Sequence, residues 1–242
     1  MPVILIWFDL KPVRFFETQH NPEIDEKFHQ LNIGNIGNVV YWWKFFEMIK
    51  NVPGDIVECG IGRGRSLIII SALNQMLDEN EGGSRHIYGY DSFEDGFPEP
   101  TSEDASIRNP KKGEWSNSPS GKYQYTIDFI KTVLSSSGVS VDINDLTLTK
   151  GFFNESLLQH PKKQIALLHL DGDLYQSYKA PLEILFDRVS SGGIIVFDDF
   201  LAKNDKDESF PGARLAVKEF LKDEFNNLKI SVVGTCYYIK PW

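Results

Sequence analysis

Four aspartates in two short stretches are the residues of this sequence best placed to do chemistry. Asp171 and Asp173 flank a glycine after one apolar run, and Asp198 and Asp199 follow another. Carboxylates at neighbouring strand ends repel one another unless a cation or protons intervene. All-oxygen ligands suit a hard ion, so Asp171, Asp198 and Asp199 are predicted to bind Mg²⁺, with Mn²⁺ or Ca²⁺ as alternatives. The competing interpretation is that these acids only cap helices.

A proton acceptor is expected beside such an ion. A metal lowers the pKa of a bound hydroxyl, and a nearby carboxylate can then take its proton. Asp173, on the loop just past Asp171, is the candidate base. His169 is the rival, because it shares a strand face with Asp171, although a histidine there is more often a hydrogen-bonded core residue.

The stretch "ECGIGRGRS" is a second candidate site. It places Gly60, Gly62 and Gly64 between a predicted strand and a predicted helix. Glycine permits a tight turn and close approach of a ligand, and the helix N-terminus favours a negative group. Asp91 ends the next strand, where it could bind the hydroxyls of a ribose, and Glu58 needs a polar partner. A tight turn without a ligand is the alternative.

The spacing of these glycines bears on the choice of cofactor. A nicotinamide site has the pattern G-x-G-x-x-G with an acid about 20 residues further on. Here the spacing is G-x-G-x-G, and Asp91 lies 27 residues after Gly64. An S-adenosylmethionine site tolerates both departures, and Glu58 could attract the ammonium of its methionine part.

The elements that must position these residues alternate between strands and helices. Apolar patterning predicts strands at residues 55–60, 86–91, 146–151, 163–171 and 192–200, and two more within 229–240. Helices are predicted at 38–50, 65–77, 122–138, 174–190 and 213–225. This order predicts an α/β fold with a mostly parallel sheet, an antiparallel C-terminal hairpin and ligands at the carboxyl ends of the strands.

Two segments stand apart from this pattern. Residues 92–121 are rich in proline, serine, glycine and charge, and a loop of that length predicts a functional lid. Residues 1–50 are predicted to form an N-terminal helical segment for substrate or dimer contacts, ahead of one domain over 51–242. In its helix, an apolar face is expected from Val39, Trp42, Trp43, Phe46 and Ile49.

Composition limits the partners. The 242 residues carry a formal net charge of −9, which argues against nucleic acid and against an anionic membrane surface. Two cysteines make no disulfide framework, so a cytoplasmic location is expected. The apolar run "VILIWF" is too short for a signal-peptide core or a membrane span, and predicts a strand or a docking segment.

Five stretches together resemble the macrocin O-methyltransferase family, class I methyltransferases that decorate sugars of macrolide and aminocoumarin antibiotics. They span residues 52–220 and read "VPGDIVECGIGRGRS", "YGYDSFEDGFPEPTSED", "KGFFNESL", "LLHLDGDLYQSYKAPLEILFDRVSSGGIIVFDDF" and "PGARLAVKEF". The family pattern D-x-D-x-Y-x-S falls on Asp171, Asp173, Tyr175 and Ser177. Departures are "GIGRGR" in place of the usual "GVWRGG", Ser92 where threonine is common, and a loosely matched N-terminal region.

The resemblance implies a Rossmann-like class I methyltransferase fold with a seven-stranded sheet and helices on both faces. It implies an S-adenosylmethionine- and Mg²⁺-dependent O-methyltransferase acting on a hydroxyl of a sugar or glycosylated small molecule. Asp173 matches the general base, and Asp171, Asp198 and Asp199 match the metal ligands. The implied cofactor contacts are Glu58, Gly60, Ile61, Gly62, Ser66, Asp91, Ser92, Phe152 and Asp171. Four lid aromatics could cover the cofactor or stack on a sugar, with packing of the lid itself as the alternative for each: Phe93, Phe97, Trp115 and Tyr123.

Three other functions remain open from the residues themselves. A NAD-dependent oxidoreductase is disfavoured by the glycine spacing. A metal-dependent glycosyltransferase could use "DGD", but it would not explain Asp198 and Asp199 on the adjacent strand. A catalytically inactive binding module should have lost acids from the cluster. The acceptor is expected to be a hydroxylated small molecule, and a homo-oligomer is possible through the aromatic N-terminal segment.

Overall fold

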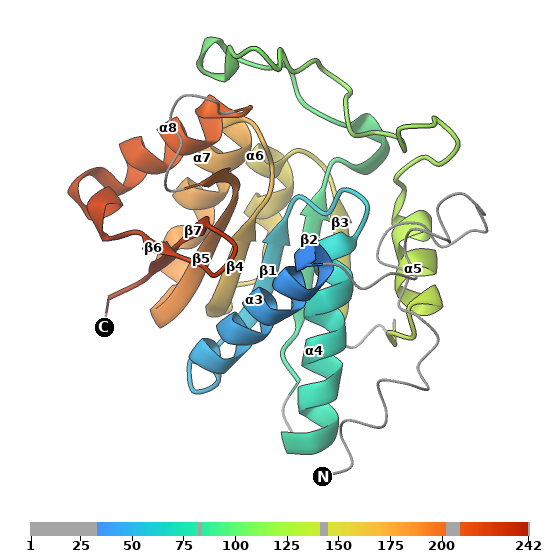
Figure 1. Cartoon of the computed structure of the whole chain (residues 1–242), viewed down its shortest axis with the longest axis vertical. Helices are drawn as coiled ribbons and strands as arrows, with labels where there is room; N and C mark the ends of the chain where they lie inside the picture. Colours follow the sequence, from blue (N-terminus) through green and yellow to red (C-terminus); the bar gives the residue numbers. More distant parts are fainter. Residues whose placement is uncertain (1–32, 82–83, 141–144, 202–208, 242) are drawn as a thin grey trace.

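A computed structural model describes residues 33–81, 84–140, 145–201 and 209–241 (Figure 1). The predicted strand or docking segment "VILIWF" lies outside these residues. The α-helices are α3 (Ile33–Ile49), α4 (Arg65–Glu81), α5 (Ile127–Ser136), α6 (Phe153–Ser156), α7 (Tyr175–Leu185) and α8 (Pro211–Leu221). The strands are β1 (Asp55–Cys59), β2 (Ile87–Asp91), β3 (Leu146–Lys150), β4 (Ile165–Leu170), β5 (Val189–Leu201), β6 (Lys229–Ile230) and β7 (Thr235–Ile239).

The seven strands form one sheet in the order β3-β2-β1-β4-β5-β7-β6. Strands β1 to β5 pair in parallel, whereas β7 is antiparallel to both β5 and β6. The predicted mostly parallel sheet with an antiparallel C-terminal hairpin is therefore confirmed. The physical reason is the connection: β6 and β7 are joined by a short turn, and antiparallel neighbours need no crossover helix.

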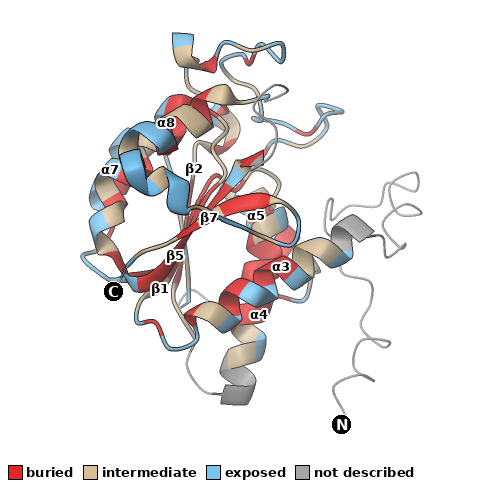
Figure 2. Ribbon diagram, turned by 60° about the vertical axis from the view of Figure 1, so that its left-hand side comes forward, coloured by how far each residue is buried: buried red, intermediate tan, exposed pale blue. Residues whose placement is uncertain are grey.

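Helices cover both faces of the sheet and bury two separate apolar cores (Figures 1 and 2). One core packs under α3, α4 and α5, and the other under α7 and α8. Side chains alternate along a strand, so Leu167 belongs to the first core and its neighbour Leu168 to the second. The same alternation decides which way each functional side chain points.

Helix α3 is present as predicted, but it is rotated relative to the predicted apolar face. Trp43 is 41% exposed and Val39 is only partly buried, whereas Tyr41 and Phe45 are buried. The buried stripe also includes the predicted Trp42, Phe46 and Ile49. With several apolar faces on one helix, periodicity alone could not decide which of them meets the sheet. The predicted division at residue 51 stays a prediction, since α3 packs into the same core as α4.

Two other predicted helices are too long. The helix predicted over 174–190 ends at Leu185, and β5 begins at Val189. The helix predicted over 122–138 begins at Ile127, where the Thr126 side chain accepts a hydrogen bond from the Phe129 N–H. Its first predicted residues instead form a bridge between Gln124 and Asn117.

Both cysteines are free and buried, Cys59 at the end of β1 and Cys236 in β7. Burial raises the pKa of the Cys59 thiol well above its usual value. Among the described residues, no helix is both long enough and apolar enough to cross a membrane.

Candidate active site

The glycine loop begins where β1 and β4 end side by side. Gly60 has a φ of +97°, and a Cβ atom there would lie 1.8 Å from the Asp171 carbonyl oxygen. The Asp171 N–H donates to the Cys59 carbonyl at 2.9 Å, which holds the two strand ends together. Only glycine fits this close approach, so the glycine loop (residues 60–64) is held against the start of the acidic turn (residues 171–174) between β4 and α7.

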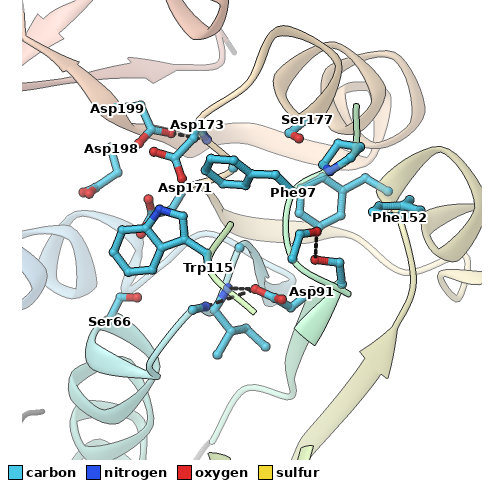
Figure 3. Close-up of a pocket in the computed structure, with 18 of the residues that line it drawn as sticks. Ser66, Asp91, Phe97, Trp115, Phe152, Asp171, Asp173, Ser177, Asp198 and Asp199 are labelled. Carbon is cyan, nitrogen blue, oxygen red and sulfur yellow. Dashed lines mark hydrogen bonds between the residues drawn. The ribbon is translucent and has the colours of Figure 1, made fainter. Parts of the chain in front are cut away.

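Asp91, at the end of β2, shapes the rest of the loop. Its Oδ2 accepts hydrogen bonds from the N–H groups of Ile61 at 2.6 Å and Gly62 at 3.0 Å (Figure 3). Its Oδ1 accepts another from the Phe93 N–H. Burial raises the pKa of Asp91, although these backbone hydrogen bonds oppose the rise. A carboxylate has about four acceptor positions, so Asp91 keeps capacity for a ligand hydroxyl.

Glu58 and His169 form a buried polar pair beneath the loop. Both side chains have 0% exposure, and Glu58 Oε1 lies 3.2 Å from His169 Nδ1 and accepts a hydrogen bond from Ser66 Oγ. His169 Nε2 lies 3.7 Å from Asp198 Oδ1. Burial alone would lower the pKa of His169, but the Asp198 and Glu58 carboxylates outweigh it and raise the pKa to about 10. His169 is fully buried between two carboxylates and does not line the cavity, whereas Asp173 does, which favours Asp173 as the base.

Asp198 and Asp199 line the same cavity at the end of β5 but take different partners. Asp198 follows Val196 on the α3 side, where the Tyr41 hydroxyl donates to its Oδ1 at 3.4 Å. Asp199 follows Phe197 on the α7 side, and its Oδ2 accepts from the Asp173 N–H at 2.8 Å. Neighbouring residues of a strand face opposite sides, so the two acids take different partners.

Three ligand atoms lie close enough to share one metal ion. Oxygens of Asp171 and Asp198 and a nitrogen of His169 lie within 4.8 Å of one another, and among the described residues Asp199 is not part of this group. The prediction that Asp171, Asp198 and Asp199 hold the ion stays a prediction. His169 is paired through Nδ1 with Glu58, and its Nε2 could bind a metal only after losing its proton.

The carboxylates of this cluster repel one another, and a bound cation would reduce that repulsion. Burial, then Asp198 and Asp199, raises the pKa of Asp171 well above its usual value, and burial and Asp199 do the same for Asp173. Burial and Asp198 raise the pKa of Asp199 to about 6. Burial works against ionisation of Asp198 too, but His169 outweighs it and lowers that pKa. The donor set, mostly carboxylate oxygen, suits Mg²⁺ or Mn²⁺.

The glycine loop and the acidic turn open into a single cavity of about 680 Å³ (Figure 3). This volume lies within the range of small-molecule sites. The predicted residues that line it are Gly60, Ile61, Gly62, Ser66, Asp91, Ser92, Phe152, Asp171, Asp173, Asp198 and Asp199. Glu58 and His169 lie behind this wall instead of lining it. The predicted contact of Glu58 with a ligand ammonium stays a prediction.

Helix α3 contributes cavity residues that the sequence did not reveal. Tyr41 and Trp42 line the cavity, and the Trp42 ring packs edge-on against His169 with ring centroids 4.8 Å apart. Nothing in their spacing distinguishes them from core aromatics. Their role depends on how α3 crosses the ends of β4 and β5.

The predicted lid covers the cavity with some of its aromatic residues. Phe97 and Trp115 line the cavity, whereas Phe93 is buried in the core and Tyr123 stacks on Phe129. The lid folds back on itself through hydrogen bonds that link Phe97 to Gly113 and Glu114. Trp115 has a φ of +65°, and the guanidinium of Arg63 lies 5.2 Å from the centre of its ring. A bulky residue in this strained conformation is typical of functional sites.

A family sequence model described as "Macrocin-O-methyltransferase (TylF)" matches residues 46–233. The tetracenomycin-C rhamnosyl 4'-O-methyltransferase of Streptomyces olivaceus is 31% identical over 153 residues, which are 63% of this chain and 55% of that protein. The mycinamicin III 3''-O-methyltransferase of Micromonospora griseorubida is 27% identical over 175 residues, with coverages of 70% and 61%. The chain thus matches somewhat more than half the length of these curated relatives.

Solved structures share the fold. The calicheamicin methyltransferase CalS11 has a TM-score of 0.72 at 23% identity, over 88% of this chain and 82% of that chain. The O-methyltransferase NovP has a TM-score of 0.63 at 23% identity, over 83% and 79%. These likenesses confirm the predicted Rossmann-like class I methyltransferase fold.

Proposed function

Because the chain belongs to the macrocin O-methyltransferase family, we propose that it is an O-methyltransferase that uses S-adenosylmethionine and a divalent cation. One observation carries the proposal: a glycine loop held by Asp91 and a cluster of four aspartates face the same cavity. A methyl donor at the loop and a hydroxyl at the acids would then lie side by side.

A sugar or a glycosylated small molecule is the proposed acceptor. The relatives from Streptomyces olivaceus and Micromonospora griseorubida are named for methylation of a rhamnosyl compound and of mycinamicin III. The cavity also suits a polyol. Carboxylate oxygens of the aspartates can accept hydrogen bonds from its hydroxyls, and aromatic rings of the lid offer an apolar surface. Aromatic rings commonly supply the contact area of small-molecule sites, and a few polar groups set orientation.

The cavity suits a divalent cation and a methyl donor, since Asp171 and Asp198 lie close enough to share one ion and Asp199 lines the same cavity. Asp171, Asp198 and Asp199 are the proposed ligands of Mg²⁺ or Mn²⁺, and Asp91, Ser92, Phe152 and the glycine loop are the proposed cofactor contacts. When bound, S-adenosylmethionine supplies an electrophilic methyl group and the cation lowers the pKa of an acceptor hydroxyl and orients it. A positively charged His169 and the hydroxyl of Tyr41 would keep Asp198 in place.

Asp173 is the proposed general base. It lines the cavity, and burial with the charge of Asp199 raises its pKa, which brings its basicity closer to neutral pH. The hydrogen bond from its own N–H to Asp199 fixes the backbone at this point. Phe97 and Trp115 would exclude water from the hydroxyl that Asp173 deprotonates.

The test is methyl transfer from labelled S-adenosylmethionine to a panel of glycosides, with and without Mg²⁺. We expect Mg²⁺-dependent transfer by the wild type and a fall of roughly 100- to 10,000-fold in kcat for Asp173→Asn, with unchanged cofactor affinity. Asp128→Asn is the matched control, because Asp128 is an exposed acid on α5 that does not line the cavity.

Two results would count against the proposal. Calorimetry that detects NAD but not S-adenosylmethionine binding would favour an oxidoreductase. Full activity of Asp173→Asn would leave the methyl transfer in place but remove Asp173 as the base.

A further inference from the structure

Asp104 is a buried acid of the lid, between the cavity-lining residues Phe97 and Trp115 in the sequence. It is 2% exposed and ends the short helix η2 (Ser102–Asp104). Its Oδ2 accepts hydrogen bonds from the N–H and the hydroxyl of Thr101, at 2.8 and 3.1 Å. Its Oδ1 accepts from the N–H of Tyr175, at 2.7 Å. The hydrogen bond with Tyr175 links the lid to α7.

Tyr175 is the first residue of α7, where a helix needs an acceptor for its free N–H groups. The residue before it, Leu174, occupies the capping position and has no side-chain oxygen. Asp104 supplies the missing acceptor from 71 positions away, and its negative charge suits the positive end of the helix dipole. The lid therefore provides the N-terminal cap of α7.

The start of α7 is also the end of the acidic turn that carries Asp171 and Asp173. The structure anchors this turn on three sides: Asp171 N–H to β1, Asp173 N–H to Asp199 of β5, and Tyr175 N–H to the lid. Asp173 has a φ of +63°, a conformation that a residue with a side chain adopts at a cost. A strained residue stays in place only where its surroundings hold it.

Helix α8 packs against the contact between Asp104 and Tyr175. A Cβ atom on Gly212 would lie 2.1 Å from Asp104 Oδ1 and 2.9 Å from the Tyr175 nitrogen. Lid, α7 and α8 thus meet at Gly212 with no room for a methyl group. A second lid contact, from Ser106 Oγ to the Ser209 carbonyl at 2.8 Å, reaches the segment before α8 but not α7.

We propose that Asp104 is a positioning residue, which links the seating of the lid to the placement of Asp173. When the lid is seated, Asp104 holds the start of α7 and with it the acidic turn; when the contact is lost, the turn loosens. The consequence for catalysis rests on the proposed methyl transfer, whereas the mechanical link does not.

The variants are Asp104→Ala and Asp104→Asn, with Ser106→Ala as the matched control. An asparagine keeps one acceptor oxygen but turns an NH₂ group toward a donor, so it can serve Tyr175 or Thr101 but not both. Gly212→Ala displaces the same carboxylate from the α8 side. The added methyl group would also press on the start of α7 at Tyr175, so its effect should be at least as large as that of Asp104→Ala.

Hydrogen exchange of residues 171–178 is the first readout. We expect roughly tenfold faster exchange in Asp104→Ala and Gly212→Ala, and wild-type exchange in Ser106→Ala. Unchanged exchange in Asp104→Ala overturns the link, whether or not the wild type transfers a methyl group. An inactive wild type would defeat the proposed function, while exchange would still decide the link.

Kinetics is the second readout. We expect kcat of Asp104→Ala to fall about 10- to 100-fold. Cofactor affinity should be unchanged, because Asp91, and not Asp104, accepts the hydrogen bonds of the glycine loop. Asp104→Asn should recover part of this loss. If cofactor affinity and kcat fall together with the melting temperature, Asp104 is a general structural residue and the positioning role is wrong.

Discussion

At the scale of single residues, the sequence predicted where the functional acids lie in the fold, but not which way their side chains point. An apolar run followed by an acid correctly located Asp171, Asp173, Asp198 and Asp199 at one edge of the sheet. The sequence could not show that Asp198 and Asp199 take partners on opposite faces. It also could not show that Tyr41 reaches Asp198, because that contact joins residues 157 positions apart.

His160 makes a prediction at this scale. It is 3% exposed, and its Nδ1 lies 2.8 Å from the Tyr90 hydroxyl. Burial, then the positive Arg188, lowers its pKa from 6.5 to about 4. Above pH 6.5, His160 is mostly unprotonated in both the folded and the unfolded chain. As pH falls toward 4 the unfolded chain takes it up first, so folding stability drops by roughly 3 kcal/mol.

Urea unfolding at pH 7.5 and 4.5 measures this loss. His160→Gln should reduce the difference between the two pH values by about that amount. Equal acid sensitivity in wild type and His160→Gln would contradict the assignment.

At the scale of elements, the glycine loop offers two substitutions of the same kind with different outcomes. Gly60→Ala places a methyl group against the Asp171 carbonyl and should cost roughly 4 kcal/mol or more of unfolding free energy. Gly62→Ala meets no atom within 4 Å and has a φ of +51°, so it should cost about 1 kcal/mol. Denaturant unfolding compares them, and equal losses would show that backbone conformation alone requires both glycines.

Helix α3 supports a second comparison. Trp42→Ala removes a side chain that is 2% exposed and should cost about 3 to 5 kcal/mol. Trp43→Ala removes one that is 41% exposed and should change stability by about 0.5 kcal/mol or less. The sequence predicted both as core, so equally large losses in denaturant unfolding would support the predicted apolar face over the observed one.

At the scale of the whole molecule, the parallel sheet and its C-terminal hairpin were predictable because alternation of strands and helices is a local pattern. The links that complete the site were not. The contact of Asp104 with Tyr175 and the crossing of α3 over β4 and β5 join distant segments, and local patterning does not encode such partners. The lid was predicted from composition alone, without its anchors.

Cation binding should raise the unfolding free energy of the whole protein. At pH 8, burial of several ionised carboxylates opposes folding, and a cation bound only to the native state offsets this. At a Mg²⁺ concentration 100 times the Kd, the gain is about 2.7 kcal/mol, or roughly 5 to 10 °C in Tm. Calorimetry at matched ionic strength with Na⁺ measures it, and Asp171→Asn should show little response. An equal shift with Na⁺ would indicate screening alone.

The burial of both thiols has a practical consequence. Cys59 has 0% exposure and Cys236 has 2%, and these are the two cysteines of the sequence. Maleimide dyes need an accessible thiolate, so the native protein should stay unlabelled. A single cysteine at an exposed position of the lid, such as Lys112→Cys, would therefore accept one fluorophore and report lid movement during ligand binding. Neither natural cysteine would have to be replaced first.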